Sequence, residues 1–432
     1  MFLKRKCLFI SIILSIALVS ATIGRWSVGT VNAQNGYEEL KTFTEVLSMI
    51  KKNYVDEVKT KDLVVGAIRG MITSLDPHSG YMTPEAFKEL QVETKGEFGG
   101  LGIQIGVKDA ILTVIAPIED TPAYRAGIKA GDKIIKIAGE STKTMGITDA
   151  VSKMRGPKGS PITLTIFREG WKEPKDFNIV RDIIKIKSVK AKKLDSGIGY
   201  VKLTQFQEST GSDLSAALSN LKKEGITSLI LDLRNDPGGL LNSAVEVTEQ
   251  FLPSKKLVVY IKSRSGEKID YYTEKETSFY AEIPMVVLVN QGSASASEIV
   301  AGALKDWKRA VIIGIQTFGK GSVQSLIPLS DGSGLRLTTA KYYTPKGTSI
   351  QSVGITPDIV VKLGAKNSTD SHPVVRERDL ERHLKNESLK EDAEEKETAP
   401  LEVDEKDDLQ LQRAIDTLKT WKVFENMLKK AA

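Results

Sequence analysis

Residues 285–298 read Met-Val-Val-Leu-Val-Asn-Gln-Gly-Ser-Ala-Ser-Ala-Ser-Glu, an apolar run that ends in a serine-rich turn. The apolar run predicts a buried strand, and the pattern from Glu298 to Trp307 predicts a helix directly after the serines. Small residues at such a turn expose a hydroxyl group and leave backbone N–H groups free for an oxyanion. A second apolar strand, Val311–Ile315, leads to Thr317-Phe-Gly-Lys-Gly-Ser-Val-Gln324. The two turns together predict a hydrolase in which a lysine activates a serine.

Three serines of the first turn are candidates for the nucleophile: Ser293, Ser295 and Ser297. Ser297 stands where a helix N-cap is expected, which is a common structural use of serine. Ser295 is central, and Ala296 beside it presents an unobstructed N–H group. The residues therefore favour Ser295 but do not exclude the other two.

The base is expected to be a lysine because the histidines are badly placed. His372 and His383 lie in or beside a charged tail, and His78 lies in a turn of an N-terminal helical region. A lysine can take the proton of a serine when burial lowers its pKa from about 10.4 to roughly 7. Lys320 follows an apolar strand and stands between two glycines, so Lys320 is the expected base.

Two other interpretations of these turns are weaker. Gly314 to Lys320 fits the Gly-x4-Gly-Lys pattern of a nucleotide-binding loop, but Gly321 replaces the magnesium-binding Ser or Thr. That pattern also requires a helix next, whereas Val323–Ile327 predicts a strand. The structural alternative is an ordinary serine-rich helix cap with an unrelated loop lysine, and the glycines around Lys320 weaken it.

Composition excludes several functional classes. The net charge of +6 arises mainly from residues 1–33, which hold four Lys or Arg and no Asp or Glu, so the remaining chain carries 57 basic and 55 acidic residues. This balance argues against binding of nucleic acid. The single cysteine, Cys7, lies in the same segment, so the rest of the chain has no disulfide, cysteine-ligated metal or cysteine nucleophile.

Residues 1–33 predict a signal peptide or an N-terminal anchor. Lys4-Arg5-Lys6 precede an apolar stretch, Cys7–Val19, and Val31-Asn32-Ala33 suits a cleavage site. The apolar stretch is short for a membrane span. We therefore predict export to the periplasm, or to the outer face of the inner membrane of a bacterium, with membrane contact only through an uncleaved segment.

The rest of the chain divides by pattern into five predicted regions. Glycine-punctuated short strands favour a β-domain, alternating apolar strands and amphipathic helices favour an α/β core, and a charged stretch at 366–408 without Phe, Trp or Tyr favours a solvated linker. The apolar stripe of the last helix predicts docking or dimerisation. The regions are helices at 34–95, the β-domain at 96–180, the core at 181–362, the disordered linker at 363–408 and the amphipathic helix at 409–432.

The combined motifs resemble the carboxyl-terminal processing proteases, also called tail-specific proteases, over roughly residues 37–362. The serine run resembles the family's nucleophile motif and implies Ser295. The Thr-Phe-Gly-Lys-Gly-x-x-Gln run resembles the base motif and implies Lys320 as the general base and Gln324 as the residue that orients it. The loop Arg234–Gly239 resembles the loop that supplies a second oxyanion donor. We expect Gly238, in preference to Gly239, to donate beside Ala296.

The β-domain resembles a PDZ domain. A Gly-Leu-Gly loop forms a nest of N–H groups for a peptide carboxylate, and the adjacent strand edge can accept a peptide strand. Leu101, Gly102 and Ile103 are the expected contacts. Arg168, on the last strand of this domain, is expected to pair across to the core and to couple peptide binding to activity.

The resemblance implies a mixed α/β multi-domain fold, with a ββα-layered core like that of Clp-type proteases and crotonases and with an inserted PDZ domain. It implies a serine endopeptidase that needs no metal or cofactor. The expected partners are proteins or peptides with accessible C-termini, together with a second copy of the chain or an activating adaptor. The alternative function is a non-catalytic PDZ adaptor on a protease-like scaffold.

Overall fold

The structure is a computed structural model, and the predicted signal segment lies outside its described residues except for Ala33. None of the helices in the described ranges combines the length and apolar character of a membrane span. The described residues are 33–108, 111–274, 280, 282–362, 372–373, 375–386, 398–399 and 408–431.

Among the described residues, those up to Met71 form a compact unit of their own. This unit contains α2 (Ala33–Asn53) and most of α3 (Thr60–Thr73), as the helical periodicity of the sequence predicts. Apolar side chains of α2, including Leu40 and Met49, are exposed to solvent.

The second unit opens with a short strand, β1 (Gly80–Met82), and with α4 (Pro84–Lys95). The side chain of Thr83 caps α4 by accepting a hydrogen bond from Ala86 N at 3.3 Å. Gly96, with a φ of 72°, ends the helix in the left-handed conformation. Both ends of α4 thus follow from local capping residues.

The PDZ-like region is a small β-domain with its own apolar core. Its main sheet has the strand order β3-β4-β5-β7-β8, with β6 paired to β5, and a separate ladder joins β2 to β9. One helix, at residues 147–154, packs against β3 and β5. The elements are β2 (Glu97–Gly100), β3 (Ile103–Lys108), β4 (Ile111–Pro117), α5 (Pro122–Arg125), β5 (Lys133–Ile137), β6 (Glu140–Ser141), α6 (Ile147–Met154), β7 (Pro161–Phe167), β8 (Lys175–Val180) and β9 (Asp182–Lys185).

The centre of the core is a sheet of order β10-β11-β12-β15-β16-β19, in which every pair except β10–β11 is parallel. Its middle strands are buried on both faces, which explains why they appear in the sequence as continuous apolar runs. The strands are β10 (Val189–Leu194), β11 (Ile198–Leu203), β12 (Ser228–Asp232), β15 (Met285–Val289), β16 (Val311–Gly314) and β19 (Ile359–Val360).

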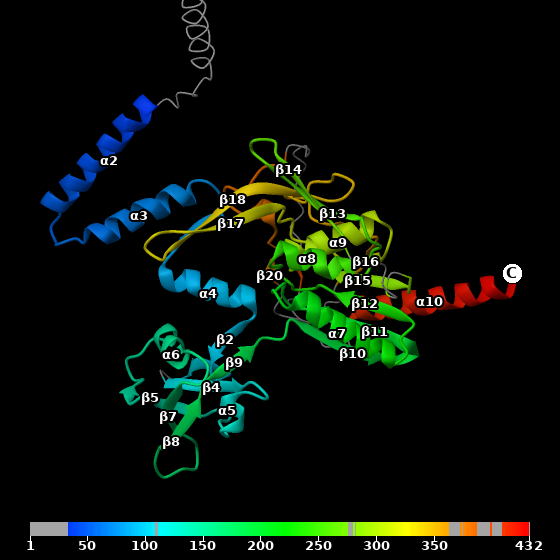
Figure 1. The fold of residues 1–432 in the computed structure, drawn as a ribbon, viewed down its shortest axis with the longest axis horizontal. Coiled ribbons are helices and arrows are strands. Elements are labelled where there is room, and N and C mark those ends of the chain that lie inside the picture. The colour runs from blue at the N-terminus through cyan, green and yellow to red at the C-terminus, as the bar shows by residue number, and fades with distance from the viewer. Residues whose placement is uncertain are drawn as a thin grey trace, which may run out of the picture. The chain divides into compact units, whose positions relative to one another are not determined.

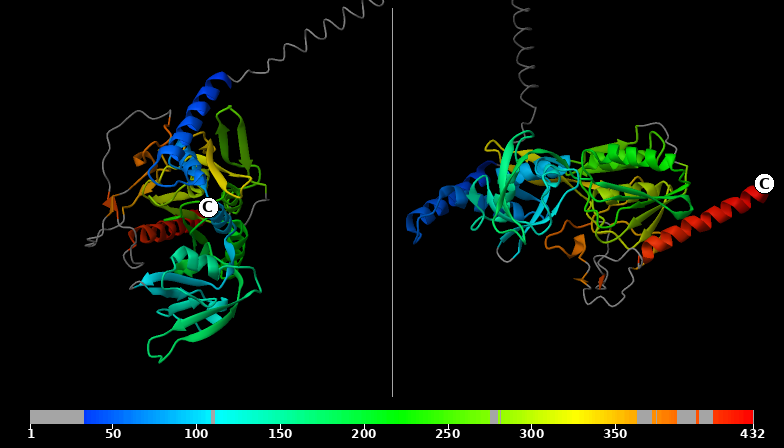
Figure 2. Two further views of the ribbon diagram at one scale, coloured as in Figure 1. Left: turned by 90° about the vertical axis from the view of Figure 1, so that its left-hand side faces the viewer. Right: turned by 90° about the horizontal axis from the view of Figure 1, so that it is seen from below.

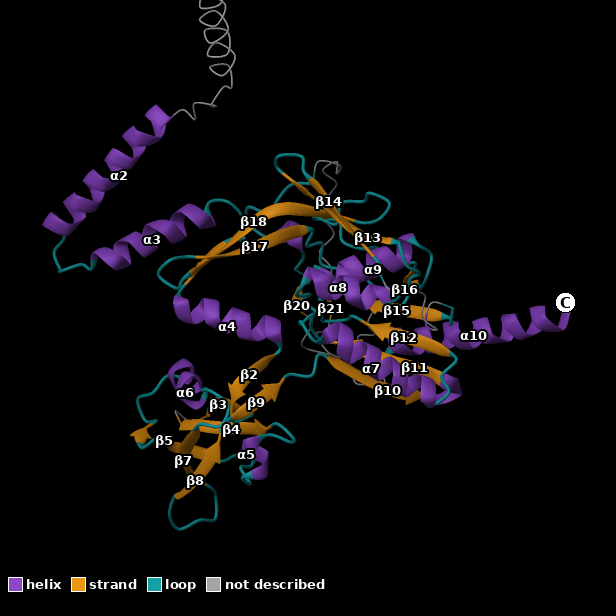
Figure 3. Cartoon of the chain, in the orientation of Figure 1, coloured by secondary structure: helices purple, strands orange, loops and turns teal. Residues whose placement is uncertain are grey.

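Helices and a second, antiparallel sheet pack over one face of the core sheet (Figures 1 and 3). The second sheet has the order β1-β18-β13-β14, with β17 paired to β18. The predicted mixed α/β architecture is confirmed. The elements of this layer are α7 (Thr210–Lys223), α8 (Leu241–Glu249), α9 (Ala296–Asp306), β13 (Leu257–Ser263), β14 (Lys268–Tyr272), β17 (Ser322–Pro328) and β18 (Gly334–Tyr343).

The opposite face of the core sheet is covered by α10 (Leu409–Ala431), seen in red in Figure 2. Leu411, Ala414 and Leu418 pack against this face, so the predicted docking of the terminal helix is observed for its first half. Beyond Leu418 the apolar side chains of the helix are exposed.

The described part of the predicted linker is not wholly solvated, which corrects the expectation from its composition. Arg376 and Glu377, in and beside a 3₁₀ turn at Glu377–Asp379, are buried, at 4% and 0% exposure. Arg376 donates to the carbonyls of Gln316 (2.6 Å) and Thr317 (2.9 Å). Charged residues are buried when each finds specific partners, and composition alone does not reveal such partners.

Candidate active site

Three loops meet at the carboxyl ends of adjacent parallel strands, where open α/β sheets place their sites. Residues 233–239 follow β12, residues 290–295 follow β15, and residues 315–321 follow β16. Ala294 N donates to Asp236 O (3.0 Å), which joins the first two loops. Phe318 N donates to Ser293 O (3.1 Å), which joins the last two. The structure therefore brings together the predicted serine and lysine turns.

Ser295 occupies a strained position at the start of α9. Its φ of 54° and ψ of −112° are rare for any residue with a side chain. Ser295 is the N-cap residue, so the expectation that Ser297 caps the helix is wrong. Ser297 Oγ instead donates to Asp236 O (2.9 Å), and Ser293 Oγ donates to Leu233 O (2.8 Å). Backbone carbonyls of the loop after β12 thus bind the hydroxyls of Ser293 and Ser297, which gives both serines a structural role.

Lys320 is half-buried, and burial lowers the pKa of its ammonium group. The positive charge of Arg336 lowers this pKa further, whereas three anionic side chains oppose the change: Glu377, Glu298 and Asp76. A lowered pKa is the condition for a lysine to serve as a base.

The hydrogen bonds of the described side chains include none between Lys320 Nζ and Ser295 Oγ. The Ser295 hydroxyl instead lies beside Tyr342 on β18. Burial raises the pKa of the Tyr342 phenol to about 12, and a side-chain hydrogen bond with Ser295 opposes that rise. Gln324, the expected orienting residue, donates through Nε2 to Ser322 Oγ (3.0 Å) and lies at 3.5 Å from Thr338 Oγ1.

Glu298 connects the serine and lysine loops, a role that the sequence pattern does not predict. Its carboxylate is fully buried and accepts from Ser295 N (2.8 Å) and Lys320 N (2.9 Å) through Oε2. Its Oε1 accepts from Thr317 Oγ1 (2.5 Å) and Gly319 N (2.7 Å). Burial raises the pKa of Glu298 to about 7, and these four hydrogen bonds oppose the rise.

Gly238 and Ala296, the predicted oxyanion donors, lie close together. Gly238 lies against the serine turn, because a Cβ there would stand 2.9 Å from Ala296 N. Ala296 N makes no hydrogen bond with another described residue. Gly238 N, by contrast, donates to Asp236 Oδ1 (2.8 Å). Gly239 approaches Phe206 so closely that a Cβ would lie 2.1 Å from Phe206 O.

Asp236 is an unforeseen buried acid beside this turn. Its side chain is fully buried, and Oδ2 has no hydrogen-bond partner. Burial raises the pKa of Asp236 to about 7, and the hydrogen bond from Gly238 N opposes the rise. In the described residues, no cluster of three or more His, Cys, Asp or Glu is arranged to hold a metal ion.

The predicted peptide contacts line a cavity of about 430 Å³ between β3 and α6. Leu101, Gly102 and Ile103 form one wall, and Ile147 and Val151 of α6 contribute apolar surface to another. A side chain cannot replace the hydrogen at Gly102, because its φ is 76° and a Cβ would lie 2.3 Å from Thr121. The groove thus combines a glycine loop, a strand edge and an apolar wall.

Arg168 does not pair with the core, which corrects the expectation. Its Nε donates to Asp132 Oδ1 (2.6 Å), and a terminal nitrogen donates to Gly127 O (2.8 Å). The guanidinium also lies over the ring of Trp171 at 4.7 Å. These partners all belong to the PDZ-like domain, where a buried aspartate satisfies the arginine locally.

Comparison with known proteins defines the family. The model of peptidase family S41 matches residues 197–361, and a PDZ domain model matches residues 113–168. A third model, described as the N-terminal domain of the activating protease CtpB, matches residues 22–86.

Relatives match over most of the chain. A carboxy-terminal-processing protease of Bartonella bacilliformis is 46% identical over 398 residues, which is 91% of each chain. The carboxy-terminal processing protease CtpA of Bacillus subtilis is 37% identical over 368 residues, or 84% of this chain and 78% of that protein. The solved photosystem II D1 C-terminal processing protease is 31% identical, covers 74% of this chain and 92% of its own, and has a TM-score of 0.44.

The fold and these matches define a serine endopeptidase that carries a PDZ domain. The chain belongs to peptidase family S41, the family of the carboxy-terminal processing proteases. The predicted enzymatic class is confirmed.

Asp236→Asn should change how stability depends on pH. Because the folded-state pKa, about 7, exceeds the ordinary 3.8, the stabilising effect of the protonated acid is complete below pH 3.8 and is lost as the pH rises through about 7. The difference between these two pKa values corresponds to about 4 kcal/mol of unfolding free energy. Asparagine keeps an acceptor for Gly238 N and does not titrate. Urea unfolding should therefore show a smaller loss of unfolding free energy from pH 4 to 8 in the variant.

The matched control is Asp56→Asn, which changes an exposed aspartate. It should follow the pH dependence of the wild type. An Asp236→Asn variant with the wild-type pH dependence would show that Asp236 does not carry a raised pKa.

Proposed function

We propose that Ser295 is the nucleophile and Lys320 the general base of this endopeptidase. The observation that carries the proposal is the Glu298 carboxylate, which binds the backbone N–H groups of both residues. The buried Glu298 carboxylate thus fixes the distance between the backbone at Ser295 and the backbone at Lys320. Ser293 and Ser297 donate to backbone carbonyls, whereas the Ser295 hydroxyl contacts the Tyr342 side chain. This contrast and the lowered pKa of Lys320 support the same assignment.

The reaction follows from these roles. Neutral Lys320 Nζ takes the proton of Ser295 Oγ as Oγ bonds to the scissile carbonyl carbon, and the π electrons move to the carbonyl oxygen. Ala296 N and Gly238 N hold this oxyanion, each contributing roughly 3 kcal/mol. The Lys320 ammonium then protonates the leaving amine as the C–N bond breaks. Water then attacks the acyl-enzyme. Lys320 takes a proton from this water and returns it to Ser295 Oγ as the acyl group leaves the serine.

Two site residues must change partners in this scheme. The substrate oxygen replaces Asp236 Oδ1 as the acceptor for Gly238 N, and Ser295 Oγ turns from Tyr342 toward Lys320. Gln324, four residues beyond the base on β17, is assigned to orient Lys320 in the reacting state. Hydrogen bonds of catalytic groups often tighten only when substrate is bound.

The groove of the PDZ domain supplies the substrate preference. The N–H groups of the loop at Leu101–Ile103 receive the C-terminal carboxylate, and the tail adds a strand along β3. Because Ile147 and Val151 make the facing wall apolar, the preferred tail ends in apolar residues. Cleavage takes place at a bond upstream of the bound tail.

Substitution of the proposed catalytic residues should abolish cleavage but not binding. The substrate is an unstructured protein that ends in apolar residues, incubated with the chain lacking residues 1–33. Ser295→Ala and Lys320→Ala should each lower kcat/KM by roughly 10⁴-fold or more, with tail-peptide affinity unchanged in fluorescence anisotropy. Lys305→Ala, near the end of α9, is the matched lysine control.

The same experiment tests the alternative, a non-catalytic adaptor. An adaptor would bind the tail peptide and leave the substrate intact in wild-type protein. Full cleavage by both Ser295→Ala and Lys320→Ala would refute the proposed residues.

Val151→Lys should weaken tail recognition selectively. A buried ammonium group in the apolar wall is unfavourable, so KM for the tailed substrate should rise by about tenfold or more. Turnover of a short peptide without the tail should stay unchanged. Lys153→Ala, an exposed position on the same helix, is the control. Equal effects on both substrates would locate the tail elsewhere.

We also propose that the chain is exported and acts in the periplasm or at the outer face of the inner membrane, with residues 1–33 as the signal or anchor. An activating adaptor is a further proposed partner, supported by the match to the N-terminal domain of an activating protease. Secretion of a reporter fused to residues 1–33 tests the export.

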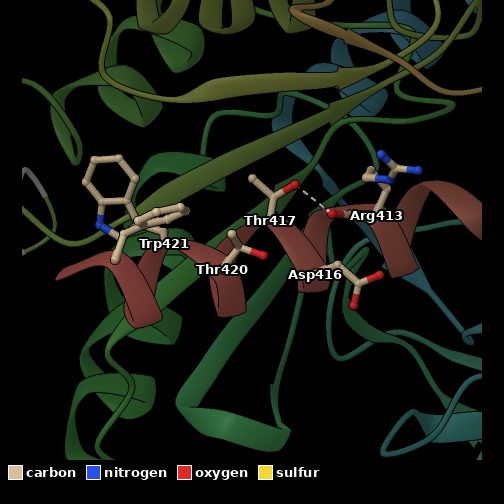
Figure 4. A pocket seen from close by; sticks show the side chains of 6 residues that line it. Arg413, Asp416, Thr417, Thr420 and Trp421 are labelled. Atoms are coloured by element: carbon tan, nitrogen blue, oxygen red, sulfur yellow. Dashed lines mark hydrogen bonds between the residues drawn. The ribbon is translucent and has the colours of Figure 1, made fainter. Parts of the chain in front are cut away.

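The end of α10 is proposed to bind a second copy of the chain. Trp421, Phe424 and Leu428 are 58%, 59% and 71% exposed, and such uncovered apolar surface marks interaction sites. A hollow of about 540 Å³ lies along this helix. Figure 4 shows the side chains that line it. It is lined by Arg413, Asp416, Thr417, Thr420, Trp421 and Phe424.

Phe424→Glu should convert a dimer to a monomer, because a charged group replaces apolar contact surface. Sedimentation velocity of the chain lacking residues 1–33 measures the mass. Lys422→Glu, an exposed neighbour, is the control for added negative charge. A wild-type protein that stays monomeric at micromolar concentrations would contradict this assembly.

A further inference from the structure

Two segments that are distant in the sequence meet beside the lysine loop. One is the turn Asp76-Pro-His-Ser-Gly80, which precedes β1, and the other is residues 375–386 from the charged tail. His78 Nε2 and the Glu377 carboxylate join them, at 2.7 Å and 2.9 Å from the two carboxylate oxygens. Neither segment has a role in the proposed reaction.

The tail segment binds the backbone on the N-terminal side of Lys320. Arg376 donates to the carbonyls of Gln316 and Thr317, and Glu377 N donates to Phe318 O (3.1 Å). The loop lies outside any helix or strand, so its carbonyls need other partners. Each of these bonds supplies one.

The Glu377 side chain also reaches the C-terminal side of Lys320 through one intermediary. Gln351 Nε2 donates to Glu377 Oε1 (2.9 Å), and Gln351 Oε1 accepts from Gly321 N (3.0 Å). Glu377 is fully buried. Glu377 therefore holds the lysine loop on both sides of Lys320. Its backbone N–H binds before the lysine, and its carboxylate acts after the lysine through Gln351.

A cation approaches the same region from the second sheet. Arg336 lies on β18 opposite Gly80 of β1, and its Nε donates to His78 O (2.8 Å). The turn at His78 thus contacts both charges, since its ring binds Glu377 and its carbonyl binds Arg336.

We propose that Glu377 and Arg336 are positioning residues of opposite charge for the general base: Glu377, held by His78 and Gln351, fixes the lysine loop on both sides of Lys320, and Arg336 holds the carbonyl of the same His78 turn. This inference rests on the proposed role of Lys320 as the base. It gives the tail segment and the Asp76–Gly80 turn a shared part in catalysis.

The charges that face Lys320 fix the expected signs. Glu377, Glu298 and Asp76 raise its pKa, and Arg336 lowers it. Removal of the Glu377 charge should therefore shift the acidic limb of the kcat/KM profile to lower pH, because neutral lysine persists there. Removal of the Arg336 charge should shift the limb to higher pH. A merely structural role would lower the rate without moving the limb.

The test measures kcat/KM against pH for Glu377→Gln and Arg336→Gln in the chain lacking residues 1–33. The two limbs should move in opposite directions, and kcat at the optimum should fall by about tenfold or more in Glu377→Gln, because the base is less well held. Arg382→Ala is the control: this arginine of the same segment donates to Thr73 O and should leave the limb in place.

The outcomes separate this inference from the proposed function. An active Lys320→Ala variant would refute the base itself. An inactive Lys320→Ala together with unshifted limbs, or with limbs that move in the same direction, would overturn the inference alone. If Glu377→Gln does not fold by circular dichroism, Arg336→Gln decides, since its limb must still move to higher pH.

Discussion

The structure of the site depends on one buried carboxylate. Glu298 has no contact with solvent, so its charge must be compensated within the protein. Four donors do this, and they come from the serine turn and from the lysine loop. Charge-assisted hydrogen bonds of this kind are about twice as strong as neutral ones. One of the four, from Ser295 N, helps to hold Ser295 in a backbone conformation that is unfavourable on its own.

This arrangement requires very close packing of the loops that end the parallel strands. At Gly314, the last residue of β16, a Cβ would stand 1.9 Å from Val289 O of the neighbouring strand. At Gly238 a Cβ would touch the turn that carries Ser295. Both glycines have a positive φ, which residues with side chains avoid. Glycine at these two positions lets the three loops pack closely against one another.

The sequence predicted those features that local patterns control. The strand at 285–289 and the helix after the serine turn matched because a single periodicity describes each of them. The prediction of the capping residue was wrong. Local rules favour Ser297, whereas in the structure its hydroxyl donates to a backbone carbonyl of the neighbouring loop. Glu298 was missed because an acid in the first turn of a helix is ordinary in sequence. Its significance lies in contacts with residues about twenty positions away.

The charged tail was misjudged for a related physical reason. Composition predicts solvation when charges have no fixed partners, but Arg376 and Glu377 find carbonyls, an amide and an imidazole on the core. The segment then acts on Lys320 in two ways. Its carboxylate raises the pKa of the lysine. Its Arg376 side chain and the Glu377 backbone N–H bind carbonyls of the loop that carries Lys320, so the segment contributes both charge and position to this lysine.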